Sequence, residues 1–111
     1  MKSIQSLLTT MSNALVAVEG LNAYHYTKPE KKNAPYCVWA ENGEGDSFHS
    51  DNHLEEQVLT GVVDYYFKGE FDPMVDKIQE ALDGVCAFEL QSVQYEDSTK
   101  LIHYSWTWEM S

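Results

Sequence analysis

The sequence predicts an α+β domain in which two helices pack on one face of a four-stranded, mainly antiparallel or mixed sheet. The expected order is helix, strand, strand, helix, strand, strand. Two segments repeat apolar residues at helical spacing, and four are rich in β-branched and aromatic residues. The chain has 111 residues, of which 43% are hydrophobic and 23% charged. That length supports one core, and no linker or internal repeat divides it, so we expect a single domain over residues 1–111.

The first helix is predicted over residues 3–19, where Gly20 is placed to end it in a left-handed conformation. Its apolar residues recur every three, four or seven positions and form one stripe: Ile4, Leu7, Leu8, Met11, Leu15 and Val18. Residues 21–35 are expected to be irregular. They contain an aromatic patch (Tyr24, His25, Tyr26) and the lysines Lys28, Lys31 and Lys32, which we interpret as a solvated loop or, alternatively, a contact surface.

Two strands are predicted next, over residues 36–40 and 54–67. In the longer strand, alternate residues form one apolar face, and the opposite face is also fairly apolar. We therefore expect this strand to be central, with helices on one side and a neighbouring subunit on the other. The intervening residues 41–53 are polar and are expected to form a long loop.

The second helix is predicted to open at Asp72-Pro73, with Asp72 as the N-cap, and to close at Gly84. A hairpin should follow, with strands over residues 87–95 and 101–110. The alternation of apolar residues slips near Gln91-Ser92, which predicts a β-bulge there.

The charge of the chain argues against binding nucleic acid or an anionic membrane. Eighteen acidic residues stand against seven lysines and no arginine, which gives a net charge of −11. Phosphate neutralisation and base readout depend on Lys and Arg, so a chain of this composition is poorly suited to either. The negative charge indicates solubility, a basic partner, or repulsion of phosphate.

The two cysteines, Cys37 and Cys86, are expected to be free thiols. They lie 49 residues apart without a second Cys or a His at zinc-site spacing. The longest early apolar run, residues 14–18, is too short for a signal core or a membrane span. We therefore expect a protein made and kept in a reducing cytoplasm.

No catalytic site, metal site or cofactor is predicted. His49 and His53, with Asp46 and Asp51, could converge on a metal only if that stretch were helical, and its Gly and Ser content indicates a loop. Paired acids such as Glu55-Glu56, or Asp72 with Asp76, are typical of solvated or capping positions. Catalysis is the weakest functional hypothesis.

The candidate interface is instead the long acidic loop together with the aromatic patch. Phe48 is the one apolar residue in the middle of that loop and is expected to anchor a protein contact. The predicted interface residues are Glu44, Asp46, Phe48, His49, Asp51, His53, Tyr24 and Tyr26.

Three segments, in their order, resemble the tail-completion (tail terminator) proteins of long-tailed bacteriophages with non-contractile tails. They are residues 34–39 (APYCVW); residues 48–53 (FHSDNH) running into the strand that ends in residues 64–68 (DYYFK); and residues 71–78 (FDPMVDKI) with the closing hairpin over 95–109. Together they cover about two thirds of the chain.

The resemblance implies a structural protein of the virion that is assembled in the host cytoplasm. Proteins of this family form a ring, usually of six copies, on the last ring of the tail tube. There they stop tube growth and present the surface that joins the head. The implied partners are thus other copies of the chain, the tail tube protein and the head-completion or connector protein.

Three alternatives stay open at the level of sequence. One is a neighbouring head–tail connector component. Another is an acidic DNA-mimic inhibitor of a basic host protein, which the twelve acids between Glu41 and Asp83 favour. Those acids are interrupted by apolar strand and helix residues, which argues against one continuous DNA-like surface. A small-molecule enzyme of unrecognised type ranks last.

Overall fold

The computed structural model of the protein describes residues 3–45, 49–50, 53–54 and 57–111. It is an α+β fold with two helices and a five-stranded mixed sheet, in the strand order β1-β2-β5-β7-β6. The helices are α1 (Ile4–Val16) and α2 (Met74–Asp83). The sheet strands are β1 (Ala23–His25), β2 (Tyr36–Glu44), β5 (Leu59–Lys68), β6 (Ala87–Glu96) and β7 (Leu101–Met110).

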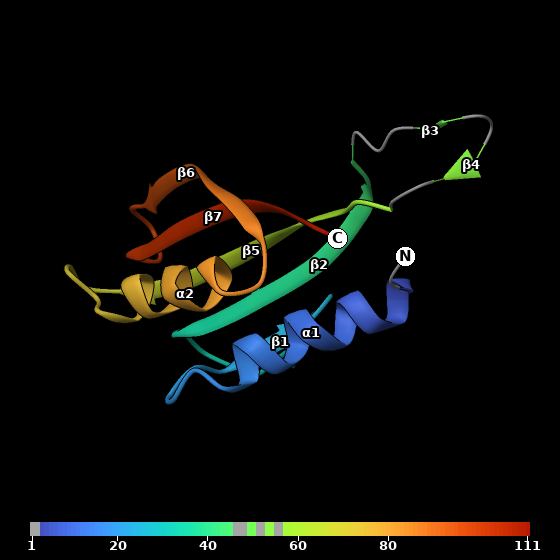
Figure 1. Ribbon diagram of the computed structural model, residues 1–111. Helices are drawn as coiled ribbons and strands as arrows, with labels where there is room; N and C mark the ends of the chain where they lie inside the picture. The colour runs from blue at the N-terminus through green and yellow to red at the C-terminus, as the bar shows by residue number, and fades with distance from the viewer. Residues whose placement is uncertain (1–2, 46–48, 51–52, 55–56) are drawn as a thin grey trace.

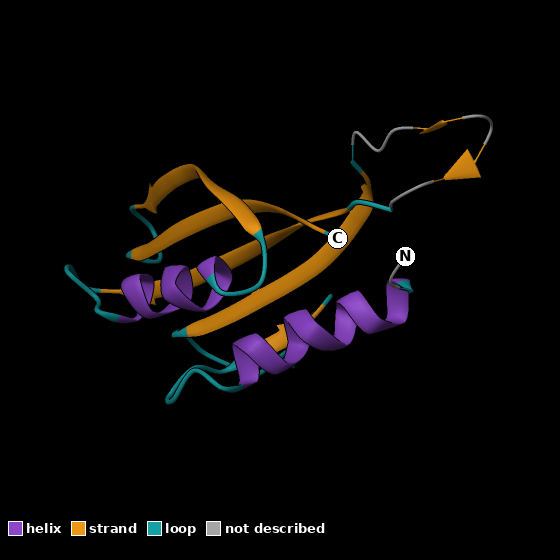
Figure 2. Ribbon diagram, in the orientation of Figure 1, coloured by secondary structure: helices purple, strands orange, loops and turns teal. Residues whose placement is uncertain are grey.

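The predicted sheet of four strands is wrong by one strand. Residues 23–25, expected to be irregular, form β1, which pairs in parallel with β2 and makes the sheet mixed. Figures 1 and 2 show both helices on one side of this sheet, as predicted, with the opposite side left open.

The predicted loop over residues 41–53 is also partly wrong. Strand β2 continues to Glu44 across an irregularity between Glu41 and Gly43, because β5 supplies backbone partners for these residues. A second, two-stranded sheet follows, made of β3 (His49–Ser50) and β4 (His53–Leu54). It lies beyond the end of the five-stranded sheet (Figure 1).

Both helices shift slightly at their ends. Helix α1 ends at Val16, three residues before the predicted end, and Gly20 adopts the expected left-handed conformation (φ 84°) in the turn that follows. Helix α2 begins at Met74, and the Asp72 carboxylate accepts a hydrogen bond from the Met74 N–H at 2.8 Å. Asp72 therefore caps the start of α2 as predicted.

The core lies between the helices and the covered face of the sheet. The buried helix residues are Leu7, Met11 and Leu15 of α1, and Ile78 and Leu82 of α2. They face alternate residues of the central strands: Cys37, Trp39, Leu59, Val63, Tyr65, Phe67, Trp106, Trp108 and Met110. The predicted alternation is confirmed for residues 59–67, and β5 is central, between β2 and β7. The predicted start of this strand at residue 54 is wrong: β5 begins at Leu59, because Leu54 pairs with His49 in the separate two-stranded sheet.

Gly61 fits this core because it lacks a side chain. It pairs with Glu41 of β2 and Trp108 of β7. A Cβ atom there would overlap the Trp108 ring and the Ala40 carbonyl oxygen. The large indole can therefore pack directly over the backbone of β5.

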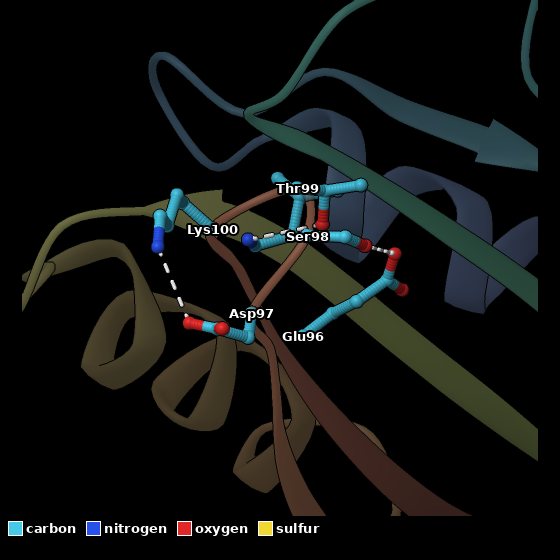
Figure 3. A network of polar contacts seen from close by, with 6 residues as sticks. Glu96, Asp97, Ser98, Thr99 and Lys100 are labelled. Carbon is cyan, nitrogen blue, oxygen red and sulfur yellow. Dashed lines mark hydrogen bonds and ion pairs between the residues drawn. The ribbon is translucent and has the colours of Figure 1, made fainter.

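The β6–β7 hairpin follows the prediction closely. Its register shifts between Leu90 and Ser92, where the bulge was expected. Short polar contacts hold the turn over residues 97–100: Lys100 pairs with Asp97 at 3.2 Å, and the Ser98 hydroxyl donates to Glu96 Oε1 at 3.0 Å (Figure 3).

Candidate interaction surfaces

The predicted interface residues fall in different parts of the molecule. Glu44 is exposed at the end of β2, Tyr24 is half-buried in β1, and Tyr26 follows β1 with 57% of its surface exposed. The backbones of His49 and His53 lie in β3 and β4. Asp46, Phe48 and Asp51 lie outside the described residues, as do the side chains of both histidines. Among the described residues of the predicted set, the structure pairs the strands that carry His49 and His53, whereas Tyr24 pairs with Val38 and Tyr26 stacks on His25, which pairs with Trp39.

The first surface is an aromatic–carboxylate cluster at the β1 edge of the sheet. The His25 ring stacks between Tyr26 and Trp39, with centroid distances of 3.8 and 3.9 Å. His25 Nε2 lies 2.7 Å from Glu41 Oε1, and the Tyr26 hydroxyl donates to Glu41 Oε2. Tyr26 itself has a positive φ of 73°, and its N–H donates to the Trp39 carbonyl at 2.8 Å.

The electrostatics of this cluster keep Glu41 ionised. Partial burial acts to raise the pKa of Glu41, but the hydrogen bonds from Tyr26 and His25 outweigh it and lower the pKa. The same hydrogen bond raises the pKa of Tyr26, because it favours the neutral hydroxyl. The cluster therefore holds Tyr26 in one position at the edge of the sheet.

The second surface is a polar–aromatic row on the open face of the sheet. His103 Nε2 lies 2.9 Å from Asp64 Oδ1, and the His103 ring stacks on Tyr66 with a centroid distance of 4.1 Å. Tyr66 stacks in turn on Tyr36 at 4.9 Å, and the Lys28 ammonium lies 5.1 Å from the centre of the Tyr36 ring. Within this row, Asp64 contacts His103 and the Lys28 ammonium contacts the Tyr36 ring, so one acid and one lysine of the open face already have partners.

The third surface is an exposed apolar group that we call the β6 patch, defined as Phe71, Leu90, Val93 and Tyr95. Their exposed fractions are 94%, 42%, 51% and 58%. The three β6 residues pair with Trp106, Tyr104 and Ile102 of β7, so they share the helix-covered side of the sheet. Because β6 is an edge strand, α2 covers the inner part of this side and leaves the patch open.

Phe71 is the most unusual residue of the β6 patch. It has a left-handed backbone conformation (φ 57°), which is uncommon for a bulky side chain, and it buries almost none of its ring. Strained residues of this kind concentrate at functional sites. Sequence reasoning missed the patch because residue type alone does not show which strand lies at the sheet edge.

The two thiols are poor nucleophiles. Burial, with a smaller effect of the nearby Asp64 charge, raises the pKa of Cys37 to about 12. Burial, followed by the charge of Asp83, raises the pKa of Cys86 to about 11. Both side chains therefore stay protonated at neutral pH.

Within the part of the chain that the structure describes, no group of three or more His, Cys, Asp or Glu side chains is arranged to hold a metal ion. No helix among the described residues is long and apolar enough to cross a membrane.

Comparison with known proteins adds no assignment to these surfaces. No protein-family model matches the chain, and a search of curated proteins finds no match.

Proposed function

We propose that this chain is a structural assembly protein of a long-tailed bacteriophage that caps the tail tube as a ring and provides the head-joining surface. Its place in the virion would be the head-proximal end of the tail. Its partners would be further copies of itself, usually six in the family it resembles, together with the tail tube protein and the head-completion protein.

The β6 patch is the observation that carries this proposal. A patch with an aromatic ring 94% exposed, beside a ten-residue edge strand, favours a protein partner that covers it. Aromatic anchors of this kind dominate the energetics of protein interfaces. The ordered resemblance of three segments to tail terminators adds the identity of the assembly.

The positions of the acids favour this reading over a DNA-mimic inhibitor. Glu41 is bound by His25 and Tyr26, Asp64 by His103, and Asp72 by the start of α2. A DNA mimic needs carboxylates that are free to face a basic protein. Several acids of the dense region are used inside the fold instead.

A nonsense mutation in this gene of the encoding phage tests the proposal. We expect tail tubes of uncontrolled length and unjoined heads, both corrected when the intact gene is supplied from a plasmid. Tails of normal length beside unjoined heads would instead assign the chain to a neighbouring connector. Normal particles made without the protein would contradict both assignments.

A further inference from the structure

A groove lined by three of the four β6 patch residues combines apolar and acidic side chains. It has a volume of about 620 Å³. Its apolar lining includes Phe71, Val93 and Tyr95, and its charged lining consists of three acids and no base: Glu70, Asp72 and Asp76. The groove therefore suits an occupant that presents an apolar or aromatic side chain beside positive charge.

The loop at the opposite edge of the same sheet offers positive charge. Three of the seven lysines of the chain lie in the loop that joins β1 to β2: Lys28, Lys31 and Lys32. Glu30 is the one acid among them, and Lys31 is exposed. Tyr26, at the start of this loop, is 57% exposed and is held by Glu41. Lys28 is engaged over the Tyr36 ring, so we call Lys31 and Lys32 alone the β1 edge surface.

The lysine loop ends, and the β6 patch lies, at the same end of the sheet, whereas Tyr26 lies farther along β2, beside Trp39 and Glu41. Tyr36, which follows the lysine loop, pairs with Tyr66 near the end of β5. Lys68, the last residue of β5, pairs with Leu101, which also pairs with Glu96 beside the patch. Figure 1 shows the β1–β2 loop and the β5–α2 loop at the same end of the strands. Copies placed side by side in one orientation can therefore bring the two surfaces together.

We infer that the β6 patch of one copy docks on the β1 edge surface of the next copy, with Phe71 at the centre of the contact. This inference rests on the proposed ring and names the surfaces that would build it. A head-to-tail contact of two different surfaces repeats from copy to copy and closes when the rotation permits. The symmetric alternative, β6 against β6, would set Glu70 and Asp76 against their own equivalents and is disfavoured by repulsion.

Sedimentation of the purified chain over a range of concentrations tests this contact. We expect reversible self-association with a dissociation constant below about 1 mM. Phe71→Ala should weaken it by about tenfold or more, because the central aromatic anchor is lost. Phe71 buries almost nothing within the monomer, so the thermal midpoint should stay nearly unchanged, and that separates a lost contact from a lost fold.

A charge exchange identifies the partner surface. Glu70→Lys with Asp76→Lys changes the net charge by two units per residue, from −11 to −7. If general repulsion alone governed association, this smaller net charge would strengthen association. Our inference instead expects association to weaken, because the groove has lost two of its acids. Adding Lys31→Glu and Lys32→Glu returns the net charge to −11 and should restore association. Glu80→Lys with Asp83→Lys, two exposed acids of α2 outside the groove, is the matched control and should not weaken association.

The outcomes separate this inference from the proposed function. A chain that stays monomeric throughout, or associates without responding to the exchange, overturns the inference even if the mutant phage makes tails of uncontrolled length. In that case, if phage carrying Phe71→Ala failed to make particles, the β6 patch would be the contact surface for a different protein. Association that follows the exchange, with normal particles made by the mutant phage, would overturn the proposed function alone.

Discussion

At the scale of one residue, Cys37 shows how burial makes a thiol unreactive and leaves it to contribute through packing. Its side chain is fully buried in β2, where it pairs with Ala23 of β1 and Tyr65 of β5. The raised pKa, about 12 against an ordinary value of 9.0, follows mainly from that burial. Cys37 therefore behaves as a small buried hydrophobe.

The stability of the protein should therefore decline at alkaline pH. Between pH 9 and 12 an unfolded Cys37 loses the proton that the folded thiol keeps. Its contribution is thus fully present below about pH 9 and is lost as pH rises toward 12. We expect this thiol to lower the free energy of unfolding by about 1 kcal/mol per pH unit between pH 10 and 11.

Urea titrations of the wild type and of Cys37→Ala from pH 7 to 11 measure this effect. At pH 7 the variant should lose about 1 kcal/mol or somewhat more through packing. Above pH 9 the free energy of unfolding of the variant should decline less steeply than that of the wild type. Tyrosine ionisation is common to both proteins, so the difference in slope is the contribution of Cys37. Equal slopes would show that Cys37 does not titrate as its burial requires.

At the scale of the elements, Asp72 joins α2 to the central strand. One carboxylate oxygen accepts the Met74 N–H at 2.8 Å, and the other accepts the Tyr65 hydroxyl at 2.7 Å. Trp106 makes a second link, because its indole N–H donates to Gln79 of α2 at 3.0 Å. The position of α2 thus depends on polar contacts at its start as well as on the buried Ile78 and Leu82.

Asp72→Ala should lower the free energy of unfolding by about 2 kcal/mol. The variant loses the N-cap and leaves the Tyr65 hydroxyl without its partner. Asp76→Ala is the control, since this exposed acid in the first turn contributes only its interaction with the helix dipole, about 0.5 kcal/mol. Urea unfolding of both variants and of Tyr65→Phe measures the coupling, and equal losses at residues 72 and 76 would contradict the bridging role.

The elements that could be predicted from sequence are those whose signals are local. Both helices, the β6–β7 hairpin and its bulge depend on spacing, caps and turn residues close in the chain. Strand β1 has only three residues and forms through parallel pairing with β2, which sequence proximity does not reveal. The extension of β2 through Asn42 and Gly43 likewise depends on β5, since neither residue favours a strand alone.

The candidate site follows the same division. Tyr24 and Tyr26 could be selected as an aromatic patch, but the hold of Glu41 on Tyr26 joins residues fifteen positions apart. The exposure of Val93 and Tyr95 depends on the strand order, which leaves β6 at an edge, and Phe71 lies in the loop between β5 and α2. Phe48, selected from the composition of its loop, lies outside the described residues.

At the scale of the whole molecule, few ion pairs among the described residues offset the negative charge of the chain. The net charge is −11 with histidine neutral, and three salt-bridge contacts form within the described residues, two of which join a histidine to a carboxylate and are ionic only when that histidine is protonated. The third, between Lys100 and Asp97, is largely exposed and contributes little. Repulsion among the remaining carboxylates therefore opposes the compact state.

Added salt should consequently stabilise the protein. Raising NaCl from about 0.01 M to 0.15 M shortens the screening length from about 30 to 8 Å and weakens repulsion between exposed acids. We expect the urea midpoint at pH 7 to rise with NaCl. Glu80→Gln with Asp83→Asn removes two exposed charges of α2 and should reduce the salt dependence while raising the midpoint at low salt. The measurement is best made with Phe71→Ala, so that self-association does not contribute to the urea midpoint. A midpoint that falls with salt would mean that attractive charge pairs outweigh repulsion between the acids.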